Sequence, residues 1–413
     1  MARMTSVVEL RVLAEDRMRA KDDDGLLALV PQLREDEQWG HWWAPGCAIA
    51  ARRLGRAQEG RRYLQEALDA GFFQPEIFDD AIEQAFGDEP DWPQLRSAFT
   101  ANVPPAPLEL LTWPTLTPAL PLELFRMKPE REEQLRPLLP DLSGSSWPRA
   151  LTLVHWVSSR WTHANDHVEA DQDALDVLHY VDHDGKRFAC VEFSIVLCHA
   201  LNAAGIPSRR LALRQRDYHA GLSKGHVASE AWIDDLGKWV VLDGQHGGYW
   251  TFGAEPLSAL ELQEALAAGR RPDLLKINGP MRTEKAGFWF SYFWHVVTTG
   301  ATLARPPYAP HFQRHMRTGQ LLVRDPAGVY PDLSEIGVTM DARDGAAAMR
   351  FTVRHPYVTG YAVRCADQRW TLDVADPVWV LPAAGGVHTA TVSVRTPHSE
   401  LRPQELSFRI APE

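Results

Sequence analysis

The stretch KRFACVEFSIVLCHALNAAGIPSRRLALRQRDYHAGLSKGHVASEAWIDDLGKWVVLDGQ, residues 186–245, decides the fold of this chain. Residues 190–204 are apolar on all sides, and Gly205 ends the run with Pro207 two positions later. This pattern predicts a buried helix with a glycine stop. Cys190 opens the helix, where unpaired backbone N–H groups and the helix dipole favour a thiolate over a thiol. The sequence therefore predicts a reactive cysteine at a helix start.

Strand-like segments follow this helix. Residues 211–214 alternate between apolar and other side chains and predict a first strand, which a polar loop at residues 216–225 follows. A second strand is expected at residues 226–234 and a third at residues 238–243. The short turn at residues 235–237 makes the second and third strands a predicted hairpin.

The hairpin brings a histidine and an aspartate to one face. In an antiparallel pair joined by an even loop, residues whose numbers sum to an odd value share a face, so His226 and Asp243 point the same way. With residues 234–237 as a four-residue loop, Asp243 lies opposite Ala228 and diagonal to His226, about 7–8 Å between backbones, which side chains can bridge. A carboxylate that orients an imidazole facing Cys190 is the arrangement of thiol acyl transfer.

These residues resemble the transglutaminase-like superfamily, which includes the peptide N-glycanase branch and many bacterial cysteine-protease-like members. That family combines a cysteine opening a helix that ends in G-I-P-x-R, a histidine opening a strand with Glu four residues later, and an aspartate closing the next strand after a Trp. The matching positions are Cys190, Gly205, Ile206, Pro207, Arg209, His226, Glu230, Trp239 and Asp243. The resemblance spans residues 147–250 and implies a papain-like α+β fold. It also implies that Cys190 is the nucleophile, His226 the general base and acid, and Asp243 the orienting residue.

The sequence departs from the family pattern in two places. The commonest family version has Trp two residues after the histidine, whereas this sequence has Ala228 there and Trp232 later. The CxxC zinc pairs of the eukaryotic N-glycanases are absent from the sequence, so we expect no metal site and no cofactor. Glu230 is interpreted as a structural partner in a strand rather than as a catalytic carboxylate. For Cys190 the alternative is an inert core cysteine, which is our interpretation of Cys198.

Length and composition predict several ordinary globular domains. The chain has 413 residues and 45% hydrophobic residues, enough for two to four cores. Its cysteines are scattered, and the N-terminus lacks an apolar signal core, which favours a reducing, cytoplasmic location. The net charge of −11 without a Lys/Arg stripe argues against nucleic-acid binding. The longest apolar-rich run, residues 287–297, is too short and interrupted to cross a bilayer, so no membrane contact is expected.

We expect a multidomain α+β protein that begins with a helical module at residues 1–103. Helices are predicted at residues 6–20, 25–34, 39–53 and 57–70. The segment at residues 48–72 has the layout of a tetratricopeptide-like unit. Its expected packing positions are Ala50, Leu54, Gly55, Ala57, Tyr63, Leu64, Ala67 and Leu68. Since a solenoid needs about three repeats and one convincing unit is visible, we expect a short helical-hairpin module.

The aromatic cluster Trp39, Trp42 and Trp43 is expected to form the core of this module. The alternative is a docking surface for a protein partner or for the neighbouring domain.

The catalytic domain is expected at residues 104–316, with its core at 147–250. Before this core, residues 102–121 are expected to form a proline-dense extended linker. Alternating segments separated by Asp-Gly, Gly-Gly and Pro turns predict an immunoglobulin-like β-sandwich at residues 317–413, starting with the strand at residues 321–325. Such a domain is expected to bind or brace, and nothing in it carries chemistry.

Aromatic residues around the core are candidates for substrate binding. The resemblance implies that a Trp upstream of the cysteine helps to hold the oxyanion, which suggests Trp156 or Trp161, with ordinary packing as the alternative. Tyr249, Trp250 and Trp289 are candidates for the walls of the cleft, since pockets are lined mainly by apolar and aromatic side chains.

Basic residues near the expected mouth predict a charge preference. Arg214, Arg216 and Lys224 come just before His226 in a chain of net negative charge. We therefore expect an acyl donor that carries a carboxylate or another anionic group near the scissile amide. The alternative is that these charges are solvated and offset neighbours such as Asp217.

The predicted function is cysteine-dependent amide acyl transfer through a thioester. Hydrolysis of a peptide-like amide, as in a protease or amidase, is the default because water is always present. Transfer to an amine, as in a transglutaminase, is the other outcome. A catalytically silent scaffold that binds proteins is the alternative function.

Overall fold

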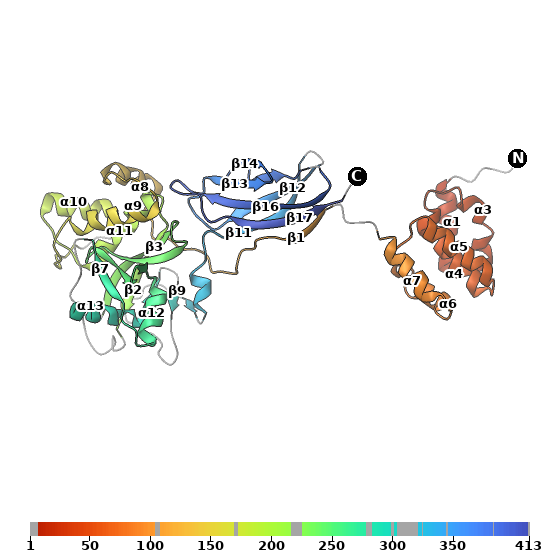
Figure 1. The fold of residues 1–413 in the computed structure, drawn as a ribbon, viewed down its shortest axis with the longest axis horizontal. Coiled ribbons are helices and arrows are strands. Elements are labelled where there is room, and N and C mark those ends of the chain that lie inside the picture. Colours follow the sequence, from red (N-terminus) through yellow and green to blue (C-terminus); the bar gives the residue numbers. More distant parts are fainter. Residues whose placement is uncertain are drawn as a thin grey trace. The chain divides into compact units, whose positions relative to one another are not determined.

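The computed structural model describes residues 7–103, 108–168, 172–215, 225–277, 283–298, 301–303, 321–323, 325–343, 346–382 and 384–411. The chain divides into two compact units, Met1–Pro107 and Leu108–Glu413, and each is described by itself. Figure 1 labels their helices and strands. Within the described ranges, none of the helices combines the length and the apolar character that a bilayer crossing requires.

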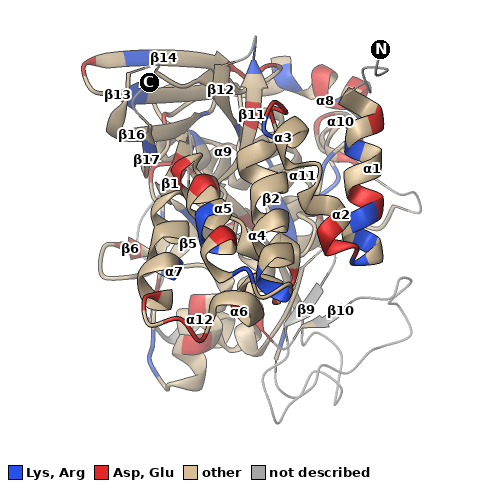
Figure 2. Cartoon of the chain, turned by 90° about the vertical axis from the view of Figure 1, so that its right-hand side faces the viewer, with Lys and Arg blue, Asp and Glu red and all other residues tan. Residues whose placement is uncertain are grey.

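The N-terminal unit is helical over its described residues. Its elements are α1 (Val7–Ala20), α2 (Asp23–Leu27), α3 (Val30–Leu33), the π-helical turn η1 (Trp39–Trp43), α4 (Ala44–Arg53), α5 (Ala57–Asp69), the 3₁₀ turn η2 (Pro75–Phe78), α6 (Ala81–Phe86) and α7 (Trp92–Ala101). The predicted helix at residues 25–34 is divided into α2 and α3. Acidic and basic side chains both occur along α1 and α5 (Figure 2), so neither helix presents a basic stripe.

Helices α4 and α5 form the predicted hairpin. Gly55 lies in the turn between them with φ of 74°, a left-handed conformation that glycine adopts without strain. Most of the expected packing positions are buried, namely Ala50, Tyr63, Leu64, Ala67 and Leu68. Leu54, Gly55 and Ala57 are exposed instead, because they lie in or beside the turn between the two helices.

The tryptophan cluster belongs to the core of this unit, as the first of the two alternatives predicts. Trp43 is fully buried, and Trp39 and Trp42 pack against the same cluster. The Trp39 ring lies edge-on to Tyr63 with 5.9 Å between centroids, and the Trp42 ring lies 5.2 Å from Phe78. These aromatic contacts join η1 to α5 and η2.

The central domain of the C-terminal unit has helices on both faces of a sheet. The described strands run in the order β10-β9-β8-β2-β3-β4-β5-β6, with β7 paired to β5. Their bounds are β2 (Ser208–Arg214), β3 (Gly225–Ile233), β4 (Lys238–Asp243), β5 (Gly248–Phe252), β6 (Glu255–Pro256), β7 (Asp273–Lys276), β8 (His295–Val297), β9 (Ala301–Leu303) and β10 (Leu321–Val323). The helices and 3₁₀ turns are α8 (Pro129–Leu135), η3 (Arg136–Leu138), α9 (Ser146–Ser158), α10 (Ala174–Asp184), α11 (Cys190–Ala203), α12 (Ala259–Ala267), α13 (Thr283–Phe290), η5 (Ser291–Trp294) and η6 (Pro326–Val329).

Alternating residues of the sheet contribute to two different cores. Val240 and Leu242 of β4 pack with apolar residues of α9, α10 and α11. Val241, between them, packs with α12 and η5 on the other face. This alternation is the period of two that the sequence shows in the third predicted strand.

The predicted helix and hairpin are confirmed in detail. Helix α11 begins at Cys190 and is followed by Gly205, which has φ of 78°. Strands β3 and β4 pair antiparallel with Ile233 opposite Lys238, which leaves the predicted four-residue loop at residues 234–237. The same register continues to Ser229 opposite Leu242 and brings Asp243 level with Ala228, as expected.

The C-terminal strands form two antiparallel sheets around one core. One sheet has the order β1-β17-β16-β13-β14 and the other β11-β12-β15. Their bounds are β1 (Leu108–Thr112), β11 (Ile336–Arg343), β12 (Ala346–Val353), β13 (Gly360–Cys365), β14 (Gln368–Asp373), β15 (Val378–Val380), β16 (Gly386–Arg395) and β17 (Gln404–Ile410). Phe351 of β12 meets Tyr361 of β13, and Trp379 of β15 meets Phe408 of β17, each at 5.8 Å between ring centroids. The sheets therefore face each other as a sandwich.

Two segments pair differently from the sequence analysis. Strand β1 lies in the expected linker, but it pairs with β17, with Leu108 opposite Ile410. Strand β10, expected as the first strand of the sandwich, pairs in parallel with β9 of the central sheet. Both segments are short, three residues in β10 and five in β1, and so short a strand does not specify where its hydrogen-bond partners lie.

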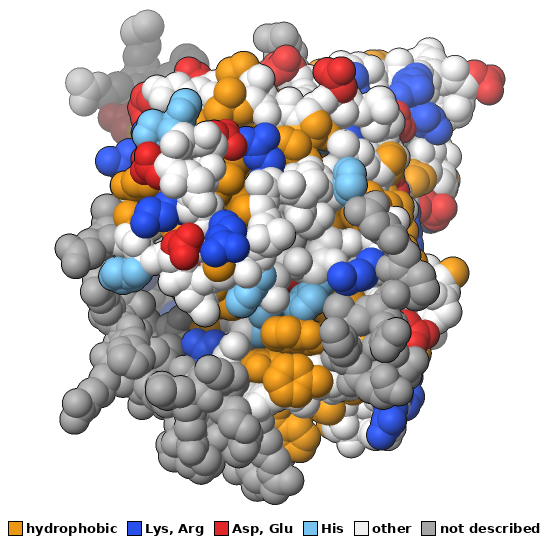
Figure 3. Space-filling model, turned by 90° about the vertical axis from the view of Figure 1, so that its left-hand side faces the viewer, with side chains coloured by type: hydrophobic (Ala, Val, Ile, Leu, Met, Phe, Trp, Pro, Cys, Tyr) orange, Lys and Arg blue, Asp and Glu red, His pale blue; other side chains and the backbone are white. Residues whose placement is uncertain are grey.

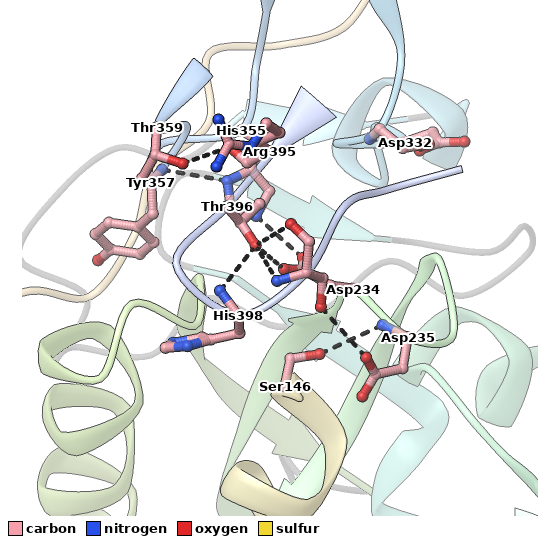
Figure 4. Close-up of polar contacts among 12 residues, drawn as sticks. Ser146, Asp234, Asp235, Asp332, His355, Tyr357, Thr359, Arg395, Thr396 and His398 are labelled. Carbon is pink, nitrogen blue, oxygen red and sulfur yellow. Dashed lines mark hydrogen bonds and ion pairs between the residues drawn. The ribbon is translucent and has the colours of Figure 1, made fainter. Parts of the chain in front are cut away.

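Polar contacts join the sandwich to the central domain (Figure 4). Thr396 Oγ1 donates to Asp234 Oδ2 at 2.7 Å, and His355 Nε2 lies 3.2 Å from Asp234 Oδ1. Tyr357 donates its hydroxyl to Asn202 Oδ1 at 2.9 Å, and His398 Nε2 lies 2.5 Å from the carbonyl oxygen of residue 204. The last two contacts reach the C-terminal end of α11.

Candidate active site

Cys190 is the first residue of α11, as the sequence predicts. Glu192 accepts a hydrogen bond from the backbone N–H of Ala189 at 3.2 Å, which caps the helix start. Cys190 is half-buried, whereas Cys47, Cys198 and Cys365 are buried; all four are free thiols. Among the cysteines, Cys190 thus combines exposure with the positive end of a helix dipole.

His226 and Asp243 meet at one end of the paired strands β3 and β4, because β3 starts where the antiparallel β4 ends. His226 Nε2 lies 2.8 Å from Asp243 Oδ2, and both side chains are buried. Cys190 also acts on this imidazole, because its hydrogen bonding and its charge help to raise the pKa of His226. The structure therefore brings together the cysteine, histidine and aspartate that the sequence analysis selected.

The surroundings of His226 favour its charged form. Burial by itself would lower the pKa of His226, but the negative charge and hydrogen bond of Asp243, together with Cys190, outweigh burial and raise it to about 9. Burial would likewise raise the pKa of Asp243, but His246 and His226 hold it well below its ordinary value. At neutral pH the site can therefore hold an imidazolium between a carboxylate and the thiol.

Three other residues of the family motif, Arg209, Glu230 and Trp239, form a buried cluster in the same domain. Arg209 of the G-I-P-x-R motif donates two hydrogen bonds to Glu230 Oε2, at 2.9 and 2.8 Å. Glu230 Oε1 accepts the backbone N–H of Ala259 at the start of α12, at 2.8 Å. The Arg209 guanidinium lies over the Trp239 ring at 4.3 Å. Glu230 is thus a structural partner, as predicted, and the motif couples the end of α11 to β3, β4 and α12.

A family model described as the transglutaminase-like superfamily matches residues 141–244. The central domain belongs to the transglutaminase-like superfamily. Among solved structures, the chain is similar to the crystal structure of red sea bream transglutaminase, with 12% sequence identity and a TM-score of 0.19. The match covers 64% of this chain and 54% of the bream chain, so it spans about half the length of that protein. No curated protein matches this sequence.

The transglutaminase-like domain contains a second histidine beside the site, His246, which the sequence analysis did not select. His246 Nδ1 lies 2.8 Å from Asp243 Oδ2, and its backbone N–H donates to Asp243 Oδ1 at 3.0 Å. The turn closes with Gly247 donating to the carbonyl oxygen of Asp243 at 2.9 Å, which directs the His246 ring back to the carboxylate. A D-x-x-H spacing after a strand is the sequence signal that could have revealed this residue.

Three ligand atoms of His226, Asp243 and His246 lie within 4.8 Å of one another, a spacing that a metal ion could bridge. In this arrangement, however, the two 2.8 Å contacts have the length of charge-assisted hydrogen bonds and account for these atoms without an ion. We therefore interpret the group as a hydrogen-bonded cluster.

Of the three candidate wall residues, Trp289 is the one in contact with the site. Its ring lies 4.9 Å from His226 and 4.4 Å from His246. Trp250 is fully buried against Phe290 and Phe293 in the domain core, and Tyr249 packs edge-on against Trp147.

Tyr292 and Phe288, which the sequence analysis did not select, extend the aromatic surface beside Trp289. Tyr292 stacks on Trp289 at 5.4 Å. Burial, and then the charge of Cys190, raise the pKa of Tyr292, whose ring lies 6.0 Å from that of His226. Phe288 lies 5.3 Å from Trp289 and is 55% exposed. Histidine and hydrophobic side chains accordingly lie side by side on the face shown in Figure 3.

The two upstream tryptophans have different surroundings. Trp161 is buried, and its indole N–H donates to the carbonyl oxygen of Phe188 at 3.2 Å. The Trp161 ring also stacks on Phe193 of α11 at 4.1 Å. Trp156 is half-buried in α9 with the Arg160 guanidinium 5.7 Å from its ring. Neither contact brings an indole N–H to Cys190, and both fit the packing alternative.

The predicted basic mouth is described only in part. Arg214 is the last residue of β2 and lies opposite Gly225, the residue before His226. Its Nη1 donates to the carbonyl oxygen of Leu213 at 2.9 Å. Arg216 and Lys224 lie outside the described residues.

Proposed function

We propose that this protein is a cysteine-dependent hydrolase or acyltransferase that cleaves a peptide-like amide through a thioester on Cys190. The observation that carries the proposal is the buried pair of His226 and Asp243, with 2.8 Å between Nε2 and Oδ2, together with the helix-start Cys190, which helps to raise the pKa of His226. The transglutaminase-like domain around it supports cysteine-dependent acyl transfer or hydrolysis in general. We propose hydrolysis before transfer to an amine, because an amine acceptor needs a binding surface of its own and water does not.

In the proposed reaction, His226 holds the proton of Cys190, and the Cys190 thiolate forms a C–S bond to the amide carbonyl carbon. Backbone N–H groups at the start of α11 stabilise the oxyanion of the tetrahedral intermediate. The C–N bond then breaks, and His226 gives its proton to the leaving amine. Water, deprotonated by His226, attacks the thioester; the C–S bond breaks and a carboxylic acid is released. An amine in place of water gives transfer.

Alkylation with iodoacetamide, followed by intact mass, tests the nucleophile. We expect Cys190 to react at neutral pH about tenfold faster than the same thiol in denatured protein, because a thiolate rather than a thiol is the reactive form. Cys190→Ala should abolish fast labelling and amide cleavage, whereas the control Cys198→Ala, in the buried middle of α11, should keep both.

Labelling no faster than in denatured protein, with amide cleavage that survives Cys190→Ala, would contradict the proposed function. It would favour the alternative of a catalytically silent scaffold.

We also propose that the acyl donor carries an anionic group near its scissile amide. Arg214 supports this proposal by its position at the end of β2, opposite Gly225, the residue that precedes His226 in β3. Each of Arg214→Ala, Arg216→Ala and Lys224→Ala is expected to lower kcat/KM for an anionic donor by a factor that shrinks as salt is raised. Unchanged, salt-independent kinetics in all three variants would refute the preference.

The nature of the N-terminal helical unit and of the C-terminal sandwich, and the cellular location, are proposals as well. We propose that the helical unit is tetratricopeptide-like and offers a surface to a protein partner, on the evidence of the α4–α5 hairpin. The shared core of the two C-terminal sheets supports an immunoglobulin-like sandwich, and the four free thiols fit a cytoplasmic location. The absence of nucleic-acid and membrane binding stays a prediction from charge and sequence.

A further inference from the structure

The Asp243 carboxylate is held by two histidines. Its Oδ2 lies 2.8 Å from both His226 Nε2 and His246 Nδ1, and its Oδ1 accepts the backbone N–H of His246 at 3.0 Å. His246 is itself fixed, because its side chain is only 8% exposed and its ring packs edge-on against Trp289 at 4.4 Å.

These contacts limit the rotation of the carboxylate. A carboxylate with one donor can turn about its Cβ–Cγ bond and leave the imidazole without a partner. Because the ring and backbone of His246 donate to different oxygens, Oδ2 is kept in the direction of His226. Since a carboxylate accepts only, His246 must present Nδ1 as a donor. The same contacts favour the ionised form of Asp243 that His226 requires.

We propose that His246 is a positioning residue that holds Asp243 in place and so keeps His226 protonated beside the Cys190 thiolate. This inference rests on the proposed function, since it assigns a fourth member to the same candidate site. His246 acts through Asp243 and is not assigned a contact with substrate.

The proposal predicts how the reactivity of Cys190 depends on pH. The titratable groups that face His226 are Cys190 from α11, Asp243 from β4, Tyr292 from η5 and His246 itself. Without a fixed Asp243, His226 loses protons at lower pH, and the thiolate is no longer paired with an imidazolium. The onset of thiolate reactivity then moves to higher pH.

Two substitutions separate hydrogen bonding from packing. In His246→Asn the side-chain nitrogen occupies nearly the place of Nδ1, so a donor to Asp243 is kept. In His246→Leu the volume is kept but the donor is lost. His179→Asn, on the exposed side of α10, is the matched control outside the site.

The measurement is the rate of iodoacetamide alkylation of Cys190 in the full-length protein from pH 4 to 9, with the melting temperature recorded alongside. His246→Leu is expected to raise the pH of half-maximal rate by about one unit, which is about a tenfold loss of rate at pH values below the plateau. His246→Asn should restore most of the wild-type profile, and His179→Asn should not change it.

An unchanged profile in His246→Leu, or an equal shift in His246→Asn, would overturn the role of His246 while the fast labelling of the wild type still supports the proposed function. Wild-type Cys190 that reacts no faster than a denatured-state thiol would overturn both.

Discussion

At the scale of single residues, the candidate site depends on charges that are buried together. His226 and Asp243 are each costly to ionise when buried alone, and each makes the charge of the other favourable. The thiol at the start of α11 adds a third group whose negative charge the same imidazolium stabilises. We therefore expect any reactivity of Cys190 to depend on the cluster rather than on the cysteine alone.

The two shifted groups predict a pH optimum of stability. The pKa of His226 is raised from 6.5 to about 9, so its stabilisation is full below about pH 6.5 and is lost as the pH rises through 9. The pKa of Asp243 is lowered from 3.8, so its stabilisation is present above about pH 4 and is lost in acid. We expect the free energy of unfolding, measured in urea, to decline between pH 6.5 and 9.5.

His226→Gln removes the raised group, and in this variant the decline between pH 6.5 and 9.5 should be smaller. An equal decline in both proteins would show that other groups cause it.

At the scale of elements, the family motif describes one buried ion pair with its surroundings. Arg209 enters from the segment after α11, Glu230 from β3, and Trp239 from β4. Because Glu230 also accepts the N–H of Ala259, it connects the sheet to the start of α12. The residues of the motif that do not reach the thiol thus position the strands that carry His226 and Asp243.

Breaking this pair should destabilise the domain strongly. Arg209 and Glu230 side chains are 4% and 0% exposed, so Glu230→Gln leaves a buried guanidinium without its counter-charge. We expect a loss of about 3–5 kcal/mol in the free energy of unfolding. The measurement is equilibrium unfolding in urea.

The double variant Arg209→Met/Glu230→Met should be less destabilised than Glu230→Gln, because no charge is left buried. A loss below about 1 kcal/mol in Glu230→Gln would contradict the structural role.

At the scale of the C-terminal unit, the sandwich makes polar contacts with the end of the helix that carries Cys190. Tyr357 and His398 make polar contacts with Asn202 and with the carbonyl oxygen of residue 204, at the end of α11 opposite to the thiol. The last carbonyl groups of a helix have no partner within it, so the His398 contact satisfies a group that would otherwise need water, while Tyr357 holds the side chain of Asn202. The sandwich is in this sense part of the support of the site.

Loss of the Asp234 contacts should weaken the association of the two domains. Asp234→Ala removes the partner of buried His355 and of Thr396 (Figure 4), and we expect a loss of about 2–3 kcal/mol in the free energy of unfolding. Limited proteolysis should then cleave between the domains sooner than in wild type. Asp367→Ala, on an exposed turn between β13 and β14, is the control. Equal stability of the two variants would contradict a role of Asp234 in joining the domains.

The sequence by itself determined the parts of the site that depend on local rules. A glycine stop and an apolar run placed Cys190 at a helix start, and the parity of an even hairpin put His226 and Asp243 on one face. Only the tertiary structure decided that His246 folds back to Asp243 and that Trp250 lies in the core while Trp289 lies at the site. It also decided that part of the expected linker pairs with β17 as strand β1, and that β10 joins the central sheet instead of the sandwich. Local spacing limits which way a side chain points, whereas the choice among distant partners depends on packing that no short stretch encodes.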